Sequence, residues 1–90
     1  MIQIRLFVSP VCPKCPSAKA LADELQKSRN DIKIEILDVS AEENYLAALM
    51  LQIASTPTFV IGDTPIYRGT VPALQEFNEK IDEYKQKYGN

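Results

Sequence analysis

The order of apolar and polar positions along the chain predicts a series of strands and helices. Apolar and polar side chains alternate over residues 2–8, as is typical of a strand. Over residues 13–29 the apolar positions recur at helical spacing, which predicts an amphipathic helix with the inward stripe Ala18, Leu21, Ala22 and Leu25. Residues 32–39 predict a second strand with apolar side chains on both faces. Such a two-sided pattern is typical of an interior strand.

A second helix is expected after this strand. Ser40 and Glu43 have the spacing of a capping box, in which hydroxyl and carboxylate satisfy the first free amides of a helix. The side chains expected to point inward from this helix are Leu46, Leu49, Met50 and Ile53.

The last third of the chain predicts a hairpin followed by a helix. Residues 58–61 and 66–68 are two short strands joined by turn residues 62–65. Gly69 permits a bend after the hairpin, and Thr70 is the expected N-cap of the closing helix. The apolar positions of that helix are Leu74, Phe77, Ile81, Tyr84 and Tyr88.

These elements predict an α/β fold in a single domain over residues 1–90. The order is strand, helix, strand, helix, strand, strand, helix. Strands joined through a helix should be parallel with a right-handed crossover, and strands joined by a short turn should be antiparallel. A mixed four-stranded sheet with helices on both faces follows, in which the third strand lies beside the first.

Composition and charge remove several classes of function. A hydrophobic fraction of 46% with 24% charged residues is typical of a soluble globular chain. The net charge of −2, with scattered basic residues, gives no electrostatic footprint for nucleic acid or anionic lipid. No apolar run is long enough for a membrane span, and the first residues lack the pattern of a secretory signal. We therefore expect a cytoplasmic protein. A monomer is a separate expectation.

The remaining chemistry is centred on two cysteines, because the chain has no histidine. That absence excludes Ser-His and Cys-His catalysis and the commonest metal ligand. Cys12 and Cys15 stand where the first strand passes into the first helix. If Cys12 is the N-cap, the positive end of the helix favours its thiolate. Cys15 shares the helical stripe of Ala18, so an exposed Cys12 and a shielded Cys15 are expected, as dithiol exchange requires.

The residues between the cysteines fit this interpretation, although other uses of the pair remain open. Pro13 suits the first helical position, and the charge of Lys14 further favours the Cys12 thiolate. The alternatives are a structural disulfide, a zinc site closed only by dimerisation, a soft-metal carrier for Cu(I), and an interaction module with incidental cysteines.

Three features of the sequence occur together, namely the run from Ser9 to Pro16, Thr56-Pro57 before the third strand, and Gly69 before the closing helix. With them the chain resembles the thioredoxin and glutaredoxin superfamily over essentially its whole length. The small thioredoxins and glutaredoxin-like proteins of archaea and some bacteria are the most similar group. The resemblance implies a thioredoxin fold, with Cys12 as attacking thiol and Cys15 as resolving thiol. It also implies a cis bond at Thr56-Pro57, which exposes the Thr56 backbone for pairing with an extended substrate segment.

The same resemblance implies an enzyme that reduces protein disulfides without a bound cofactor. Its expected partners are disulfide-bearing proteins and a thioredoxin-type reductase, and its substrate surface comprises Pro13, Lys14, Thr56, Pro57 and Gly69. Thioredoxins generally carry a tryptophan and a buried aspartate where this chain has Val11 and Leu6. Glutaredoxins usually carry an aromatic residue in the motif and a Gly-Gly pair, whereas this chain has Lys14 and Gly69-Thr70. Direct protein reduction is therefore favoured, and glutathione-dependent reduction is the alternative.

Overall fold

The structure, a computed structural model, describes residues 1–88 and follows the predicted order of elements. The elements are β1 (Ile2–Val8), α1 (Cys15–Ser28), β2 (Ile32–Asp38), α2 (Glu42–Met50), β3 (Thr58–Ile61), β4 (Thr64–Arg68) and α3 (Leu74–Tyr88). The sheet order is β2-β1-β3-β4, with β1 and β2 parallel and the other neighbours antiparallel. The expected mixed four-stranded sheet, and the position of β3 beside β1, are confirmed.

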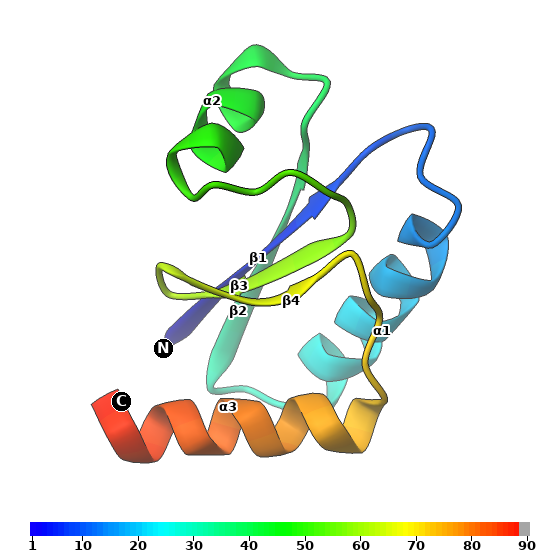
Figure 1. The fold of residues 1–90 in the computed structure, drawn as a ribbon. Helices are drawn as coiled ribbons and strands as arrows, with labels where there is room; N and C mark the ends of the chain where they lie inside the picture. Colours follow the sequence, from blue (N-terminus) through cyan, green and yellow to red (C-terminus); the bar gives the residue numbers. More distant parts are fainter. Residues whose placement is uncertain (89–90) are drawn as a thin grey trace.

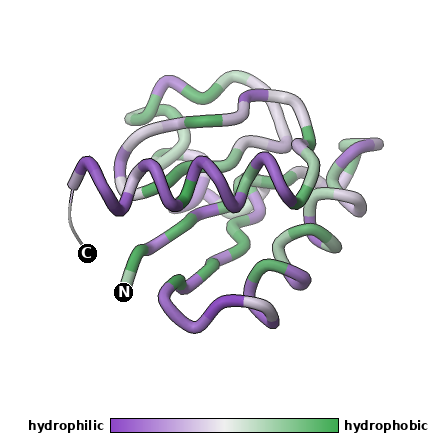
Figure 2. The backbone as a smooth tube through the Cα atoms, turned by 90° about the horizontal axis from the view of Figure 1, so that it is seen from below, coloured by the Kyte–Doolittle hydropathy of each residue, from purple (hydrophilic) through white to green (hydrophobic). Residues whose placement is uncertain are grey.

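The sheet is covered on both faces, as Figure 1 shows. One face packs on α1 and α3, and the other packs on α2. The larger core, below α1 and α3, includes Ile4, Leu6, Ala18, Leu25, Phe59, Phe77 and Ile81, all fully buried. The smaller core, below α2, consists of Phe7, Ala48, Ile53 and Val60. The tube in Figure 2 shows the amphipathic character of α3, whose polar residues face away from the sheet.

The prediction that the second strand is interior is wrong, because β2 forms one edge of the sheet. Only Ile32 of this strand is buried, Ile34 and Leu37 are partly exposed, and Ile36 keeps 46% of its surface accessible. Part of the open edge is occupied by the side chain of Gln26 from α1. The Gln26 amide donates to the Ile32 carbonyl at 2.9 Å and accepts the Ile34 N–H at 2.8 Å. Apolar content on both faces therefore reflects burial by α1 and α2 rather than a second neighbouring strand.

The expected capping box of the second helix is also wrong. α2 begins at Glu42 with Ala41 as N-cap, and none of the side chains of residues 1–88 caps it. The Asp38 carboxylate instead accepts the Ser40 N–H at 2.8 Å, and this hydrogen bond lowers the Asp38 pKa below its ordinary value. Because this local turn involves Ser40, the chain enters the helix one residue later than the capping-box pattern predicts.

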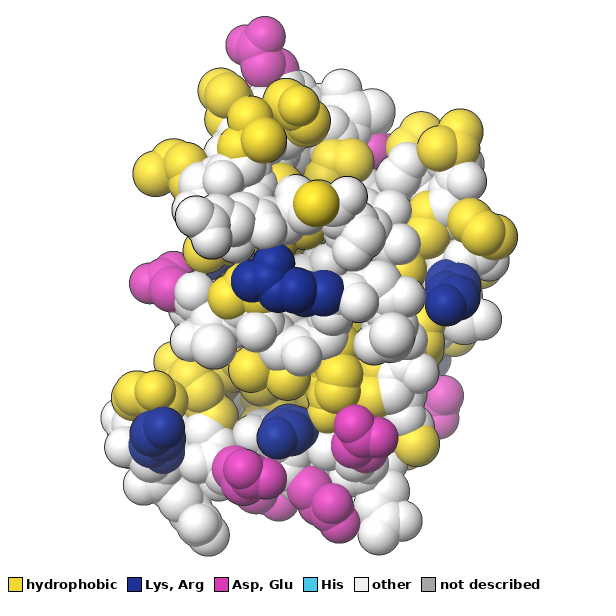
Figure 3. All heavy atoms as spheres, viewed as in Figure 1, with side chains coloured by type: hydrophobic (Ala, Val, Ile, Leu, Met, Phe, Trp, Pro, Cys, Tyr) yellow, Lys and Arg dark blue, Asp and Glu magenta, His cyan; other side chains and the backbone are white. Residues whose placement is uncertain are grey.

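The inward face of α2 differs from the prediction as well. Ala48 is buried against the sheet, whereas Leu46, Leu49 and Met50 have exposed fractions of 51%, 50% and 86%. Only Ile53 of the expected set is buried. The chain reverses at Gln52, whose φ is 57°, and returns Ile53 to the core through its N–H bond to the Ala48 carbonyl at 2.9 Å. Hydrophobic side chains accordingly gather on the surface over α2 (Figure 3).

The hairpin and the last helix have shifted boundaries. The turn has only two residues, Gly62 and Asp63, so β4 begins at Thr64 rather than at residue 66. The expected N-cap at Thr70 is wrong, because α3 begins at Leu74. Pro72 disfavours a helical backbone at the residue before it, which delays the start of the helix. Phe77 and Ile81 are buried as the pattern predicts, and Tyr88 is 61% exposed.

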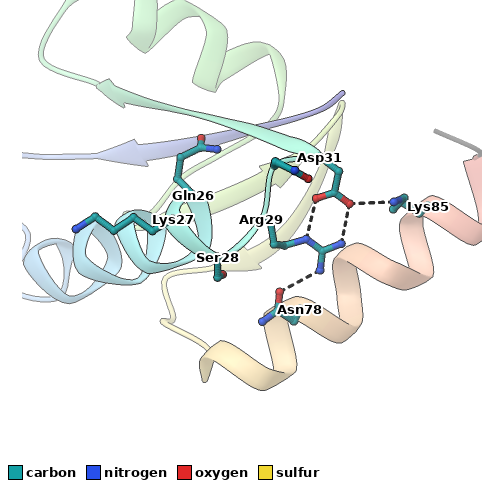
Figure 4. Close-up of a pocket in the computed structure, with 8 residues that line it drawn as sticks. Gln26, Lys27, Ser28, Arg29, Asp31, Asn78 and Lys85 are labelled. Carbon is teal, nitrogen blue, oxygen red and sulfur yellow. Dashed lines mark hydrogen bonds and ion pairs between the residues drawn. The ribbon is translucent and has the colours of Figure 1, made fainter.

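The end of α1 distant from the cysteines is tied to α3 by a charged network (Figure 4). The Arg29 guanidinium donates two hydrogen bonds to the Asp31 carboxylate at 3.0 and 2.9 Å. It also bonds Asn78 at 3.0 Å and Asp82 at 2.9 Å, and Lys85 donates to Asp31 at 2.9 Å. These contacts fasten α3 to the connection between α1 and β2. The Arg29 and Lys85 cations hold the pKa of the Asp31 carboxyl well below its ordinary value.

Removing the Asp31 charge should weaken the fold in a pH-dependent way. Asp31→Asn should lose about 1 to 2 kcal/mol of stability at neutral pH, because it removes a two-pronged pair and a lysine contact that are only partly screened by water. Since the folded state holds the Asp31 pKa below its ordinary value of 3.8, this contribution is complete above that value. It should disappear as the pH falls below about 4.

Urea unfolding at a series of pH values measures the difference between Asp31→Asn and the wild type. The matched control is Asp23→Asn, which removes the exposed pair of Asp23 with Lys27 on α1. The control should leave the profile almost unchanged, because exposed pairs contribute little. A stability gap for Asp31→Asn that stays constant between pH 7 and pH 2 would contradict this interpretation.

Candidate functional site

Two consecutive turns after β1 form the segment that carries the cysteines. The Cys12 N–H donates to the Ser9 carbonyl at 3.2 Å, which closes a β-turn with Pro10 at its second position. The Ser9 hydroxyl oxygen accepts the Val11 N–H at 3.3 Å. The Cys15 N–H then donates to the Cys12 carbonyl at 3.4 Å. These turns leave Val11 88% exposed at the tip of the segment.

The predicted start of the first helix is wrong by two residues, and Pro16 explains the shift. A helix capped by Cys12 needs an N–H at residue 16 for the Cys12 carbonyl, and proline has none. α1 therefore begins at Cys15, with Lys14 as N-cap and Pro16 in the first turn, where no N–H is used. Pro13 consequently lies in the turn before the helix rather than at its first position.

Cys12 and Cys15 are joined by a disulfide, with their Cα atoms 5.4 Å apart. Cys15 is only 3% exposed and belongs to the larger core, whereas Cys12 is partly exposed. Cys15 is followed along the helix by the buried Ala18, Ala22 and Leu25, as the helical stripe predicts. Because the disulfide joins Cys12 to the first residue of α1, the Cys12 sulfur still lies near the positive end of the helix. The two cysteines thus differ in access, although both lie near the start of α1.

The Thr56–Pro57 segment lies at the same end of the sheet. Phe7 of β1 pairs with Thr58 of β3, so the chain after β1 and the chain before β3 leave the sheet together. The peptide bond between Thr56 and Pro57 is cis. Pro57 is buried and Thr56 is partly exposed. Within residues 1–88, neither the N–H nor the C=O of Thr56 makes an intramolecular hydrogen bond.

Gly69 and Lys14 complete the set of predicted site residues. The Gly69 N–H donates to the Pro57 carbonyl at 2.7 Å, with Gly69 at a φ of 75°. The Lys14 ammonium, on an exposed side chain, reaches the Gly69 carbonyl at 3.5 Å. Lys14 therefore bridges from the cysteine segment to the loop after β4. Pro13 is exposed and makes none of these contacts.

A groove of about 270 Å³ lies between α2 and the chain that precedes Pro57. Its wall includes Ser9 from the cysteine segment, Tyr45 and Ala48 from α2, and Thr56. The groove therefore connects the surface of α2 with the backbone at Thr56. The larger hollow in Figure 4 lies around Arg29 and Lys85, and is separate from the cysteines.

Sequence reasoning missed three residues that shape the site, namely Ser9, Ser55 and Thr58. Ser9 precedes Pro10, and serine followed by proline is a recognised start of a β-turn, so this signal was present. The Thr58 hydroxyl donates to the Ser55 carbonyl at 2.7 Å. No local pattern indicates that bond, because it forms only once the loop before β3 is folded.

Within residues 1–88, no group of three or more His, Cys, Asp or Glu side chains is placed to hold a metal ion. None of the helices in the same range has the length and apolar character needed to cross a bilayer.

Comparison with known proteins identifies close relatives over nearly the whole chain. The family model described as thioredoxin domain matches residues 2–82. A probable thioredoxin of Archaeoglobus fulgidus is 33% identical over 91 residues, covering 99% of this chain and 98% of the relative. A thioredoxin of Methanocaldococcus jannaschii is 37% identical over 81 residues, covering 88% of this chain and 94% of the relative.

The fold is similar to solved thioredoxin structures. Oxidised mitochondrial thioredoxin 3 from Saccharomyces cerevisiae superposes with a TM-score of 0.72 at 19% identity, covering 91% of this chain and 77% of the yeast chain. The family match, the archaeal relatives and the Cys12–Cys15 disulfide therefore lead to one conclusion: the chain belongs to the thioredoxin family and is a thiol–disulfide oxidoreductase.

Proposed function

We propose that this chain reduces disulfide bonds of partner proteins by dithiol exchange through Cys12-Pro13-Lys14-Cys15 and is re-reduced by a thioredoxin-type reductase. The observation that carries the proposal is the difference in exposure between the partly exposed Cys12 and the 3% exposed Cys15. Only Cys12 is accessible to a bulky partner. A reducing compartment such as the cytoplasm would supply both residues as thiols.

The first step of the proposed reaction takes place at Cys12. Its thiolate, favoured near the positive end of α1, attacks one sulfur of the partner's disulfide. The partner's S–S bond breaks as a new S–S bond to Cys12 forms. The second partner sulfur leaves as a thiolate and takes a proton from water.

The second step takes place at Cys15. After its thiol has lost a proton to solvent, the Cys15 sulfur attacks the Cys12 sulfur of the mixed disulfide. The bond to the partner breaks, and the released partner thiolate takes up a proton. The partner gains two electrons and two protons in all, and the protein is left with the Cys12–Cys15 disulfide.

The surface beside Cys12 supports docking of an extended chain. Among residues 1–88, the backbone N–H and C=O of Thr56 have no hydrogen-bond partner, which suits pairing with an added strand. Pro57, Gly69 and the ammonium of Lys14 border the same surface, linked by the Gly69 bonds to Pro57 at 2.7 Å and Lys14 at 3.5 Å. Pro13 lies next to Cys12 on the exposed turn. These residues are proposed to contact the partner.

A reconstituted assay with two electron donors tests this function. The protein is mixed with insulin and either a flavin-containing thioredoxin reductase or glutathione with glutathione reductase, and NADPH oxidation is followed. We expect insulin reduction to depend on this chain in the first mixture, because the accessible cysteine and the open Thr56 backbone suit a protein disulfide.

Cys12→Ser is the control and should reduce the rate to that of the mixture without the chain. Turnover with glutathione alone, on a small mixed disulfide, would replace the proposal by a glutaredoxin function. A complex with Cu(I) that survives gel filtration, together with no insulin reduction, would replace it by a metal carrier.

A further inference from the structure

The backbone of Thr56 is held from both sides by short hydrogen bonds. On one side the Thr58 hydroxyl donates to the Ser55 carbonyl at 2.7 Å. On the other side the Gly69 N–H donates to the Pro57 carbonyl at 2.7 Å. The carbonyls directly before and directly after Thr56 are therefore engaged, while the N–H and C=O of Thr56 itself stay unpaired within residues 1–88. This arrangement holds the backbone on both sides of Thr56 while leaving the Thr56 N–H and C=O available.

Thr58 is unusual among the described residues, because it is the buried polar side chain of the core and is 0% exposed. It sits on β3 near the smaller core, where a valine of the same shape would avoid the cost of burying a hydroxyl. Its hydroxyl makes the bond to Ser55 and no other hydrogen bond within residues 1–88. Packing alone therefore gives no reason for threonine at this position.

Ser55 also connects Thr58 to the second bond of the loop. A Cβ atom added to Gly69 would lie 3.1 Å from the Ser55 hydroxyl oxygen, so the two residues are in close contact. Gly69 adopts a φ of 75°, which glycine reaches at little cost, and its N–H is directed at the Pro57 carbonyl. The hydrogen bond from Thr58 therefore holds Ser55 in place, and Ser55 in turn lies against Gly69.

We infer that Thr58 is a positioning residue, which holds the Thr56 peptide for pairing with the extended, disulfide-bearing segment of a partner protein. The inference rests on the proposed function. A loop without this bond has more backbone conformations, so pairing at Thr56 must restrict it at the moment of docking. The effect should be confined to substrates that carry a peptide backbone. A small aromatic disulfide has none and should be insensitive to the loop.

Thr58→Val tests the inference, because it keeps the side-chain shape and removes the donor. Ser55 is exposed, so water can bond its carbonyl in the variant, and the fold should persist. We expect KM for insulin to rise about 10-fold, because docking must then order a loop that lacks this hydrogen bond, at a free-energy cost similar to the net contribution of one hydrogen bond. The kcat for insulin, and the rate with 5,5′-dithiobis(2-nitrobenzoate), should stay within about two-fold of the wild type.

Thr58→Ser is the matched variant, because it keeps the hydroxyl and should restore KM close to the wild-type value. An unchanged KM in Thr58→Val would overturn the inference while leaving the proposed function intact. Equal losses with insulin and with the small disulfide would also overturn it, because they indicate general damage to the fold. A wild-type protein inactive on insulin but active on the small disulfide would overturn the proposed function and this inference together.

Discussion

Replacing Cys15 by serine should convert the protein from a catalyst into a trap for its partners. The reduced Cys15→Ser variant can still attack a protein disulfide through Cys12, but it has no second thiol to release the product. Turnover of insulin should fall about 1000-fold or more, because removal of one member of a covalent pair disables the whole cycle. A mixed disulfide on Cys12 should accumulate, visible by intact mass as the protein plus one insulin molecule.

Cys12→Ser is the matched comparison for the trapping by Cys15→Ser. Cys15 is 3% exposed, so as the only thiol it should be poorly accessible to a partner and should trap very little. Each variant replaces one sulfur of the same disulfide by oxygen, and so removes one thiol. Equal trapping by both variants would show that the difference in exposure does not separate their roles.

Replacing Phe77 by alanine should remove a large part of the stability of the fold. Phe77 is 0% exposed and meets the ring of Phe59 edge-on, with centroids 4.8 Å apart. A buried phenylalanine replaced by alanine costs about 3 to 5 kcal/mol, since it leaves a cavity and loses transfer energy. A domain of this length has only about 5 to 13 kcal/mol of stability in total. The urea midpoint should fall sharply.

Two further variants place this effect in the packing of α3 on the sheet. Phe77→Leu keeps an apolar side chain in the same position and should cost clearly less than the alanine variant. Gln75→Ala lies on the exposed side of the same helix and should change stability by no more than about 0.5 kcal/mol. If Phe77→Ala and Gln75→Ala had similar midpoints, α3 would not be held by its buried ring.

The parts of the structure that follow from periodicity could be predicted from the sequence. β1 and β3 have the predicted bounds, and the stripe from Cys15 through Ala18 to Leu25 is buried as expected. Hydrophobic periodicity succeeds for α1, which packs one well-defined side against the larger core, whereas β3 is buried at all four positions and is indicated by its β-branched and aromatic residues. The same signal placed Cys15 inside the fold.

The helix starts were less predictable, because local backbone chemistry competes with the helical pattern. Pro16 moves the start of α1 to Cys15, Pro72 delays α3, and the Asp38 turn withdraws Ser40 from the start of α2. Each competing effect depends on a single side chain or a missing N–H. Their combined outcome is set by which hydrogen bonds the folded chain can complete.

The orientation of α2 could not be derived from apolar spacing, since two stripes compete on this helix. The larger residues Leu46 and Leu49 are predicted to face inward, but Ala48 is buried instead, with Ala47 partly buried beside it. Small side chains allow the helix to lie close to the sheet, and the return of Ile53 fills the adjacent core. Which side of α2 faces the sheet is therefore set by the three-dimensional path of the chain after Met50.

The two edge strands of the sheet, β2 and β4, are poorly suited to pairing with the edge strands of other molecules. The Gln26 amide occupies backbone groups at the β2 edge through bonds of 2.9 and 2.8 Å, and β4 contains Pro65 and an irregular register with β3. Proline and occupied edge groups interrupt the continuous ladder that fibrils and aggregates need. Molecules at high concentration should therefore remain dispersed, although the proposed function requires the Thr56 backbone to stay free for a partner.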